Sequence, residues 1–272
     1  MGYFILICAV VVGGVLWGVR RNRKLRFQKL LASPLSDEMQ KIIEKNIPVY
    51  LNLPADLKQL LQGYVNVFLA DKKFEGCGGQ EITDEVRVTI AAQACMLLIG
   101  RKPQHCFPRL SSVLVYPHTY IAGGGQGSFG NLDDPPSARL GESWQSGAVV
   151  LAWDSAKGGA RNFHDGQNVT LHEFAHQLDQ EDGASDGTPV LDDIASYRSW
   201  AHTFSEGYSQ FLERVEKHKK TIIDEYGATN PAEYFATATE AFFEKPEQMH
   251  KMCPDLYDEL KGYYKLDPVK WD

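Results

Sequence analysis

The chain has 272 residues, 43% of them hydrophobic and 23% charged, so it is neither disordered nor fibrous and can bury a sizeable core. Its net charge of −7 is unevenly distributed. Six basic residues precede residue 30, whereas the first acidic residue is Asp37, so the chain from residue 30 onward carries 22 basic against 35 acidic groups. An acidic body of this kind repels phosphate, so we expect no nucleic-acid partner.

The N-terminus carries a run of seventeen uncharged residues, Tyr3 to Val19, followed at once by the basic sequence RRNRKLR. A cleaved signal peptide has its charges before the apolar run, an arrangement that this segment lacks. The sequence therefore predicts a transmembrane anchor over residues 1–19 and a basic juxtamembrane linker over residues 20–35. Because the charges follow the run, the positive-inside rule predicts a single-pass protein with its N-terminus outside and its main domain in the cytoplasm.

The five cysteines are odd in number and form no CxxC pair, which favours reduced thiols in the cytosol over a disulfide framework. Residues 36–110 are predicted to be helical. Ser36 is placed to cap a helix that ends near Asn46, Pro54 opens a second helix, and Thr83 caps a third. Their apolar stripes predict core positions.

Two short apolar runs, Ser112 to Pro117 and Ala148 to Trp153, are rich in β-branched residues and predict strands. The glycine-rich segment between them, Gly123 to Gly130, lacks the GK[ST] ending of a phosphate-binding loop, which favours a surface loop. Four further helices are expected over about 168–178, 193–220, 230–244 and 254–264. We therefore expect one α+β domain over residues 36–272, with a helical part at 36–110 and a catalytic part at 111–272.

The segment 168–179 reads NVTLHEFAHQLD and contains an HExxH motif from His172 to His176. Residues four apart share one face of a helix, so the two imidazoles can bind the same metal ion. Glu173 is rotated by about 100° from His172, so it reaches a water on the metal rather than the metal, which is the position of a general base. Burying these groups without a partner would be costly, and the segment therefore predicts a catalytic zinc site.

A third ligand is needed to leave one open position on the zinc ion. Chemistry alone favours Glu233 and leaves Glu240 and Asp179 as alternatives. Glu233 has a competing interpretation, because Asn230 and Pro231 form a natural helix start and a capping box places Glu at the third helical position. Glu240 lies seven residues later on the same helical face. Asp179 follows His176 by three residues, where a short carboxylate more often bonds the backbone or orients a histidine.

Four motifs in order resemble the MtfA family of zinc-dependent peptidases, which is named for titrating the glucose repressor Mlc: LVYP (114–117), SWQSGAVVLAW (143–153), HEFAHQLD (172–179) and YGATNPAEYFA (226–236). The catalytic part is also similar to that of anthrax lethal factor. The resemblance implies a zincin-like fold with Zn²⁺ held by His172, His176 and Glu233, and Tyr226 assisting catalysis near the metal.

This resemblance implies an aminopeptidase-type activity on peptides, here held at the bacterial inner membrane by the N-terminal helix. The alternative is a regulatory protein that sequesters a partner such as an Mlc-like repressor, with catalysis secondary. Residues 148–153 are expected to form the edge strand that binds substrate. The acidic stretch 179–186 lacks the oxygen spacing of an EF-hand, which favours a solvated loop over a calcium site.

Overall fold

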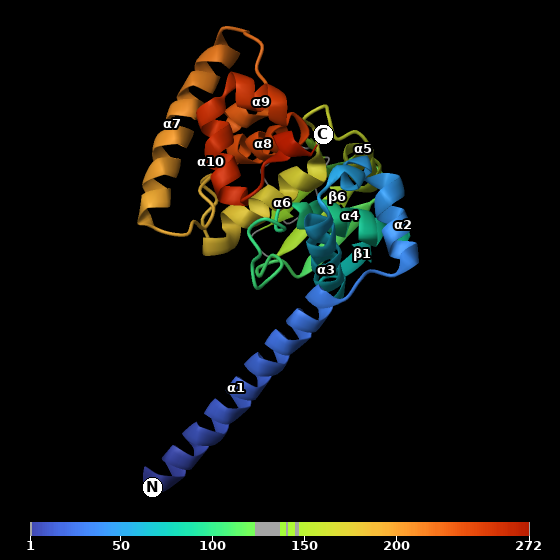
Figure 1. Cartoon of the computed structure of the whole chain (residues 1–272), viewed down its shortest axis with the longest axis vertical. Coiled ribbons are helices and arrows are strands. Elements are labelled where there is room, and N and C mark those ends of the chain that lie inside the picture. Colours follow the sequence, from blue (N-terminus) through green and yellow to red (C-terminus); the bar gives the residue numbers. More distant parts are fainter. Residues whose placement is uncertain (1, 123–136, 140, 145–146, 272) are drawn as a thin grey trace.

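The computed structural model of the chain describes residues 2–122, 137–139, 141–144 and 147–271. The glycine-rich segment Gly123 to Gly130 lies outside these residues. Figure 1 shows a long helix, α1, that leaves the body of the molecule, and helix α6 crossing the middle of that body. The sheet and helices α2–α4 lie on one side of α6, and helices α7–α10 lie on the other.

Helix α1 (Gly2–Ala32) runs unbroken across the predicted boundary between anchor and linker. No helix in the described part of the chain is long and apolar enough to cross a membrane. The predicted transmembrane anchor was therefore wrong, and with it the single-pass topology in the inner membrane. The uncharged part of α1, Gly2 to Val19, has eighteen residues and rises about 27 Å, less than the roughly 30 Å of a hydrocarbon core, and six basic residues follow it.

The three helices expected between residues 36 and 110 form: α2 (Asp37–Asn46), α3 (Ala55–Asp71) and α4 (Asp84–Met96). The predicted caps form, because the Ser36 and Thr83 side chains accept hydrogen bonds from backbone amides in the first turns of α2 and α4. The last turn of α1 packs on α3 at Gly63, where an added Cβ would lie 2.1 Å from the carbonyl oxygen of Leu31. Glycine at this position therefore permits the close approach of the two backbones.

A four-stranded sheet has the order β1-β2-β6-β5 and comprises β1 (Lys73–Gly76), β2 (Ser112–Tyr116), β6 (Ala148–Ala152) and β5 (Gly141–Trp144). Strands β1, β2 and β6 are parallel, and β5 runs antiparallel to β6. A separate antiparallel pair joins β3 (Tyr120–Ala122) and β4 (Ser137–Arg139). Both predicted strands exist, but the expectation that 148–153 forms an edge was wrong, because β6 lies between β2 and β5.

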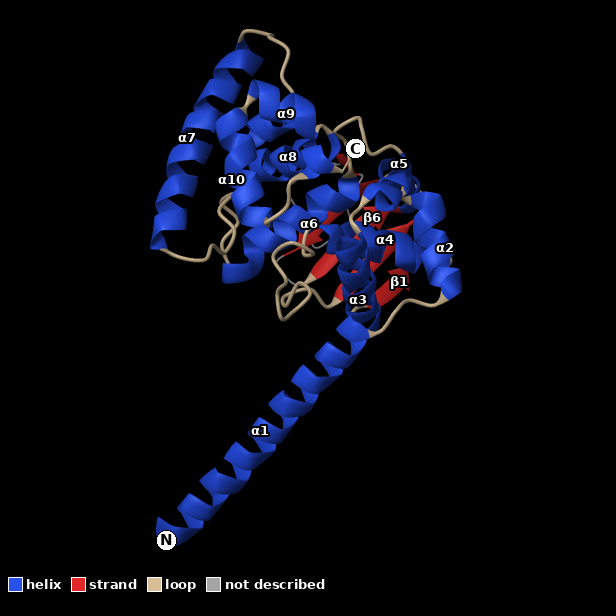
Figure 2. Cartoon of the chain, in the orientation of Figure 1, coloured by secondary structure: helices blue, strands red, loops and turns tan. Residues whose placement is uncertain are grey.

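The C-terminal half is helical, as Figure 2 shows: α5 (Trp153–Arg161), α6 (Val169–Asp179), α7 (Ile194–Glu216), α8 (Pro231–Glu244), α9 (Pro246–Met252) and α10 (Pro254–Tyr264). Helix α8 is buried along nearly its whole length, with Phe235 and Phe242 at 0% exposure. Cys77, Cys95, Cys106 and Cys253 are free thiols. Helices around a small, mostly parallel sheet confirm the predicted mixture of α and β structure.

Candidate metal centre

Helix α6 presents two histidines on one face. Asn168 caps this helix, since its side-chain oxygen accepts a hydrogen bond of 3.0 Å from the amide of Leu171. The rings of His172 and His176 lie 4.8 Å apart between centroids, and their Nε2 atoms are 3.2 Å apart. The spacing of four residues thus brings the two imidazole nitrogens to one point, as the helical periodicity predicts.

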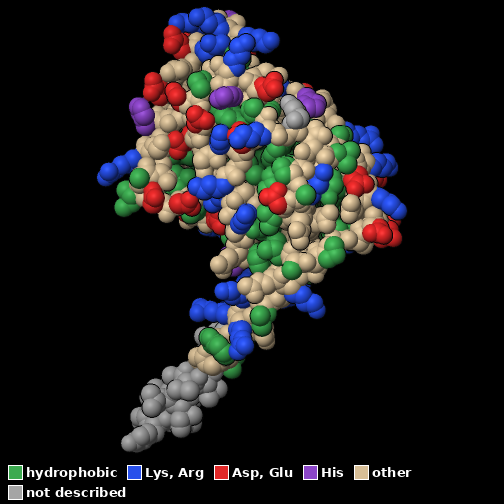
Figure 3. All heavy atoms as spheres, in the orientation of Figure 1, with side chains coloured by type: hydrophobic (Ala, Val, Ile, Leu, Met, Phe, Trp, Pro, Cys, Tyr) green, Lys and Arg blue, Asp and Glu red, His purple; other side chains and the backbone are tan. Residues whose placement is uncertain are grey.

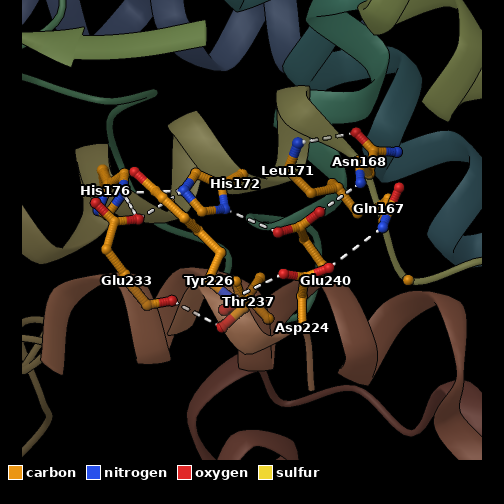
Figure 4. A network of polar contacts seen from close by, with 12 residues as sticks. Gln167, Asn168, Leu171, His172, His176, Asp224, Tyr226, Glu233, Thr237 and Glu240 are labelled. Atoms are coloured by element: carbon orange, nitrogen blue, oxygen red, sulfur yellow. Dashed lines mark hydrogen bonds and ion pairs between the residues drawn. The ribbon is translucent and has the colours of Figure 1, made fainter. Parts of the chain in front are cut away.

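Helix α8 brings Glu233 to the same point, as Figure 4 shows. Its Oε2 atom lies 2.9 Å from Nε2 of His172 and 3.2 Å from Nε2 of His176. Asn230 caps α8 by accepting a hydrogen bond of 3.0 Å from the amide of Glu233. Asn230 therefore caps the helix as a capping box requires. The Glu233 carboxylate does not complete the box, because it turns toward the histidines.

The three converging atoms fit a tetrahedral metal ion. Ligand atoms about 2.0–2.1 Å from such an ion lie roughly 3.3 Å from one another, and the three separations here are 2.9, 3.2 and 3.2 Å. Within the described residues, His172, His176 and Glu233 are the one group of at least three His, Cys, Asp or Glu side chains that meets the geometry of a metal site. Their donor set, two imidazoles and one carboxylate, is typical of a catalytic zinc site.

Glu240 lies on the opposite side of His172 from this point. Its Oε1 atom accepts a hydrogen bond of 2.8 Å from Nδ1 of His172, and its Oε2 atom accepts one from the amide of Asn168. A proton on Nδ1 leaves the Nε2 lone pair directed at the converging atoms. The structure therefore places Glu240 where it orients His172, and not in the ligand group where sequence reasoning kept it as an alternative.

Opposing effects act on the pKa values of these groups. Burial raises the pKa of Glu233, but the hydrogen bonds to His172 and His176 outweigh it and lower the pKa to about 2. Burial lowers the pKa of His172, yet the hydrogen bonds to Glu233 and Glu240 raise it well above its usual value. Burial also raises the pKa of Glu240. A carboxylate on each side of His172 thus favours positive charge at the centre, which a cation can supply.

Asp179, the other alternative ligand, lies outside the group. Its side chain is buried rather than solvated, and its Oδ2 atom accepts a hydrogen bond of 3.1 Å from the amide of Gly187. Burial raises the pKa of Asp179 to about 6. The rest of the acidic stretch forms local turns, in which Asp182 and Asp186 accept hydrogen bonds from the amides of Ala184 and Thr188. No calcium-like cluster occurs there among the described residues.

The two predicted catalytic residues lie beside the converging atoms. Glu173 is on α6, next to His172, and is only 6% exposed. Tyr226 is in a short 3-10 helix (Glu225–Thr229), where Asp224 accepts a hydrogen bond of 2.8 Å from its amide. Its ring centroid lies 6.0 Å from that of His172, and the side chain is 56% exposed. An exposed phenol next to the converging atoms is placed to meet a ligand that arrives from solvent.

Sequence reasoning missed a network that ties the start of α6 to α8. Glu244 accepts hydrogen bonds of 2.8 and 3.1 Å from the amides of Gly166 and Gln167, and one of 3.0 Å from the side chain of Asn168. Burial raises the pKa of Glu244 to about 9. The sequence signal for this network is that Glu240 and Glu244 lie four residues apart, on one helical face, with only apolar residues between them.

Replacing Glu233 and replacing Glu240 should have different effects on metal content. We expect Glu233→Ala to lose bound metal, because one of three ligands is gone. Glu240→Ala should keep the site but bind metal about 10–100-fold more weakly, because His172 is no longer held in place. Elemental analysis and competition with a chromogenic chelator measure both effects, with Glu216→Ala on α7 as the control. A full metal equivalent in Glu233→Ala would contradict the assignment.

Comparison with known proteins identifies the family of this chain. The chain is 37% identical over 270 residues to an uncharacterized protein of Synechocystis sp., an alignment that covers 97% of each chain. It is 28% identical over 228 residues to Mlc titration factor A of Serratia proteamaculans, covering 82% of this chain and 85% of the relative. The same factor of Yersinia pestis is 29% identical over 233 residues, covering 82% and 83%. Residues 19–265 match the glucose-regulated metallo-peptidase M90 family, and the chain belongs to that family.

Proposed function

We propose that this metallo-peptidase is a zincin-like enzyme that hydrolyses peptide bonds with a zinc ion held by His172, His176 and Glu233. The observation that carries the proposal is the convergence of three ligand atoms from α6 and α8 within 4.8 Å of one another. Two imidazole nitrogens and one carboxylate oxygen leave a fourth position open on a tetrahedral ion. An open position distinguishes a catalytic zinc site from a structural one.

A bound zinc ion lowers the pKa of a water molecule and polarises a substrate carbonyl group. Glu173 acts as the general base: it takes the proton of the attacking water and later passes it to the leaving amine. Its place directly after His172 on α6, with only 6% of the residue exposed, supports this role. Glu240 keeps the proton of His172 on Nδ1, so that Nε2 stays available as a ligand.

Tyr226 stabilises the negative charge that develops on the carbonyl oxygen. Its ring lies beside that of His172, and its exposure leaves the phenol accessible to an incoming substrate. A hydroxyl donor near the developing oxyanion is the usual means of lowering such a barrier. The 3-10 helix that carries Tyr226 is capped by Asp224, which fixes the backbone behind the ring.

The change of Glu173 to Gln tests the general base. We expect Glu173→Gln to keep about one zinc ion per chain while kcat falls by roughly 10²–10⁴-fold, because the amide cannot accept the proton. Metal analysis and turnover on a panel of peptides measure the two quantities. Unchanged turnover in this variant would exclude the mechanism, and loss of zinc would make the variant uninformative about the base, in which case Glu173→Asp replaces it.

The change of Tyr226 to Phe tests the oxyanion donor. We expect kcat to fall by roughly 10²-fold with little change in KM, because the hydroxyl acts on charge that exists only in the transition state. Steady-state kinetics on one good peptide substrate separate the two constants. Tyr208→Phe, which removes a hydroxyl bonded to the carbonyl oxygen of Ala228, is the matched control. A rise in KM alone would assign Tyr226 to substrate binding.

The substrate is proposed to bind as an extended strand along β5, the edge of the sheet next to α6. An edge strand offers unpaired backbone groups to a peptide, which gives affinity with little sequence preference. The resemblance to the MtfA family supports cleavage from the amino end of the peptide. Strand β6 cannot bind a peptide in this way, because it pairs with β5 on one side and with β2 on the other.

Blocking the substrate amine tests the aminopeptidase assignment. We expect a peptide with a free amino terminus to be hydrolysed at least about 10²-fold faster than its N-acetyl form, because acetylation removes the charge that marks the peptide end. Mass spectrometry of the products locates the cleaved bond. Equal rates with cleavage inside the chain would show an endopeptidase and leave the zinc mechanism intact.

The relatives named Mlc titration factor A favour a second candidate, a regulatory protein that binds a repressor similar to Mlc. In that case Glu173→Gln should retain the partner and its cellular effect, since only the proton acceptor has changed. If the peptidase is the main function, the variant should lose the cellular effect together with turnover. The same variant therefore separates the two candidates.

A further inference from the structure

A cavity of about 640 Å³ lies away from the metal centre, between helix α7 and the start of α10. Figure 1 shows α7 running alongside α10 on the side of the molecule remote from the sheet. Residues 202–214 of α7 form one wall and residues 252–259 the other, with residues 221–223 and Tyr234 completing the lining. This volume lies within the range of sites that hold small organic molecules or peptide side chains.

The interior of this cavity is apolar and aromatic. Phe211, Ile223, Tyr234 and Leu256 line it and are each almost fully buried. The Tyr234 side chain is only 2% exposed and lines the cavity. Its ring and hydroxyl therefore offer an occupant both an apolar surface and a polar group.

The rim of the cavity is acidic. Glu206, Asp255, Asp258 and Glu259 line it against a single guanidinium, that of Arg214, which donates a hydrogen bond of 2.6 Å to the carbonyl oxygen of Lys220. Asp255 and Asp258 form no ion pair within the described part of the chain. Figure 3 shows carboxylates and basic side chains interspersed on the α7 side of the body, with a cluster of basic residues at its upper end. The four carboxylates of the rim against one guanidinium favour a cationic occupant.

We propose that this cavity binds an organic cation, an ammonium or guanidinium group attached to an apolar body. The apolar body would pack on Phe211 and Tyr234, whose ring centroids lie 5.2 Å apart, and the cation would face the carboxylates of the rim. The Tyr234 hydroxyl supplies one hydrogen bond to the occupant. A free amine and a basic side chain of a peptide both have this chemistry.

Residues that line or contact the cavity are direct sequence neighbours of residues at the metal centre. Tyr234 directly follows the ligand Glu233, and Gly227 directly follows Tyr226. An added Cβ on Gly227 would lie 3.5 Å from Cε1 of Phe211 and 3.3 Å from Cα of Tyr234, so Gly227 lies close to both of these cavity-lining residues. Occupancy of the cavity therefore changes the affinity of the metal centre, a consequence that rests on the proposed metal site.

Two probes of opposite charge and similar shape test the binding. We expect 2-phenylethylamine to bind the full chain at least about tenfold more tightly than 3-phenylpropionate, because the rim repels a carboxylate. Isothermal titration measures both. A third probe, N-acetyl-Phe-Arg-amide, has no free amino terminus. Tighter binding of this peptide than of the amine assigns the occupant to a peptide, and the reverse order assigns it to a free amine.

Variants locate the binding. We expect the triple variant Glu206→Gln, Asp255→Asn, Asp258→Asn to weaken amine binding about tenfold, and Tyr234→Phe to weaken it about fivefold. The control changes three exposed carboxylates outside the cavity, Glu75→Gln, Glu216→Gln and Glu247→Gln, and should leave binding unchanged. Equal binding of the two charged probes, or full amine binding by the triple variant, would overturn the proposal.

Chelator competition tests the link to the metal centre without any turnover. A saturating amine should change the affinity for zinc by about fivefold, and zinc should change the affinity for the amine by the same factor. Selective amine binding with no effect on zinc affinity would overturn the link. Failure of the chain to hydrolyse peptides would count against the proposed function alone, since neither measurement depends on hydrolysis.

Discussion

The packing of α6 against α8 is the contact on which the rest of the molecule depends. One helix supplies both histidines and Glu173, and the other supplies Glu233 and the residues that orient its partner. Neither helix can form the proposed centre alone, because a catalytic zinc site needs three protein ligands and α6 supplies only two imidazoles. The sheet and α4 support α6 from one side, and α7 and α10 enclose α8 from the other.

This packing brings three carboxylates of α8 against α6, two of them buried and Glu233 half-buried, and that arrangement needs compensation. Glu233, Glu240 and Glu244 follow one another at spacings of seven and four along α8. Each finds hydrogen-bond donors on α6 or in the residues just before it: the two histidines for Glu233, His172 and Asn168 for Glu240, and backbone amides for Glu244. Buried carboxylates are tolerated when they are paired in this way. The pairing also sets the register of the two helices, since a slip by one turn would leave several donors and acceptors unmatched.

Much of this arrangement is predictable from local sequence, and the remainder depends on tertiary contacts. The caps at Ser36, Thr83 and Asn230 and the strands near residues 112 and 148 follow from residue chemistry that acts within a few positions. Strands β1 and β5 escape prediction because each has four residues and takes its form from its neighbours in the sheet. The predicted transmembrane anchor is wrong because the uncharged stretch of α1, although apolar, is shorter than a hydrocarbon core is thick. The position of Glu240 behind His172 cannot be read from spacing, because Glu233 and Glu240 share a helical face and only the crossing of α6 and α8 decides which carboxylate meets Nε2.

Glu233 lies in the first turn of α8, held there by the Asn230 cap. The first turn is the part of a helix that frays most readily, so its opening requires far less free energy than unfolding of the whole domain. With Glu233 as the proposed metal ligand, metal retention depends on a local event. An ion bound there would be released when the first turn of α8 opens, and it would in turn suppress that opening. On this assignment the protein can lose its metal, and regain it, while its core stays folded.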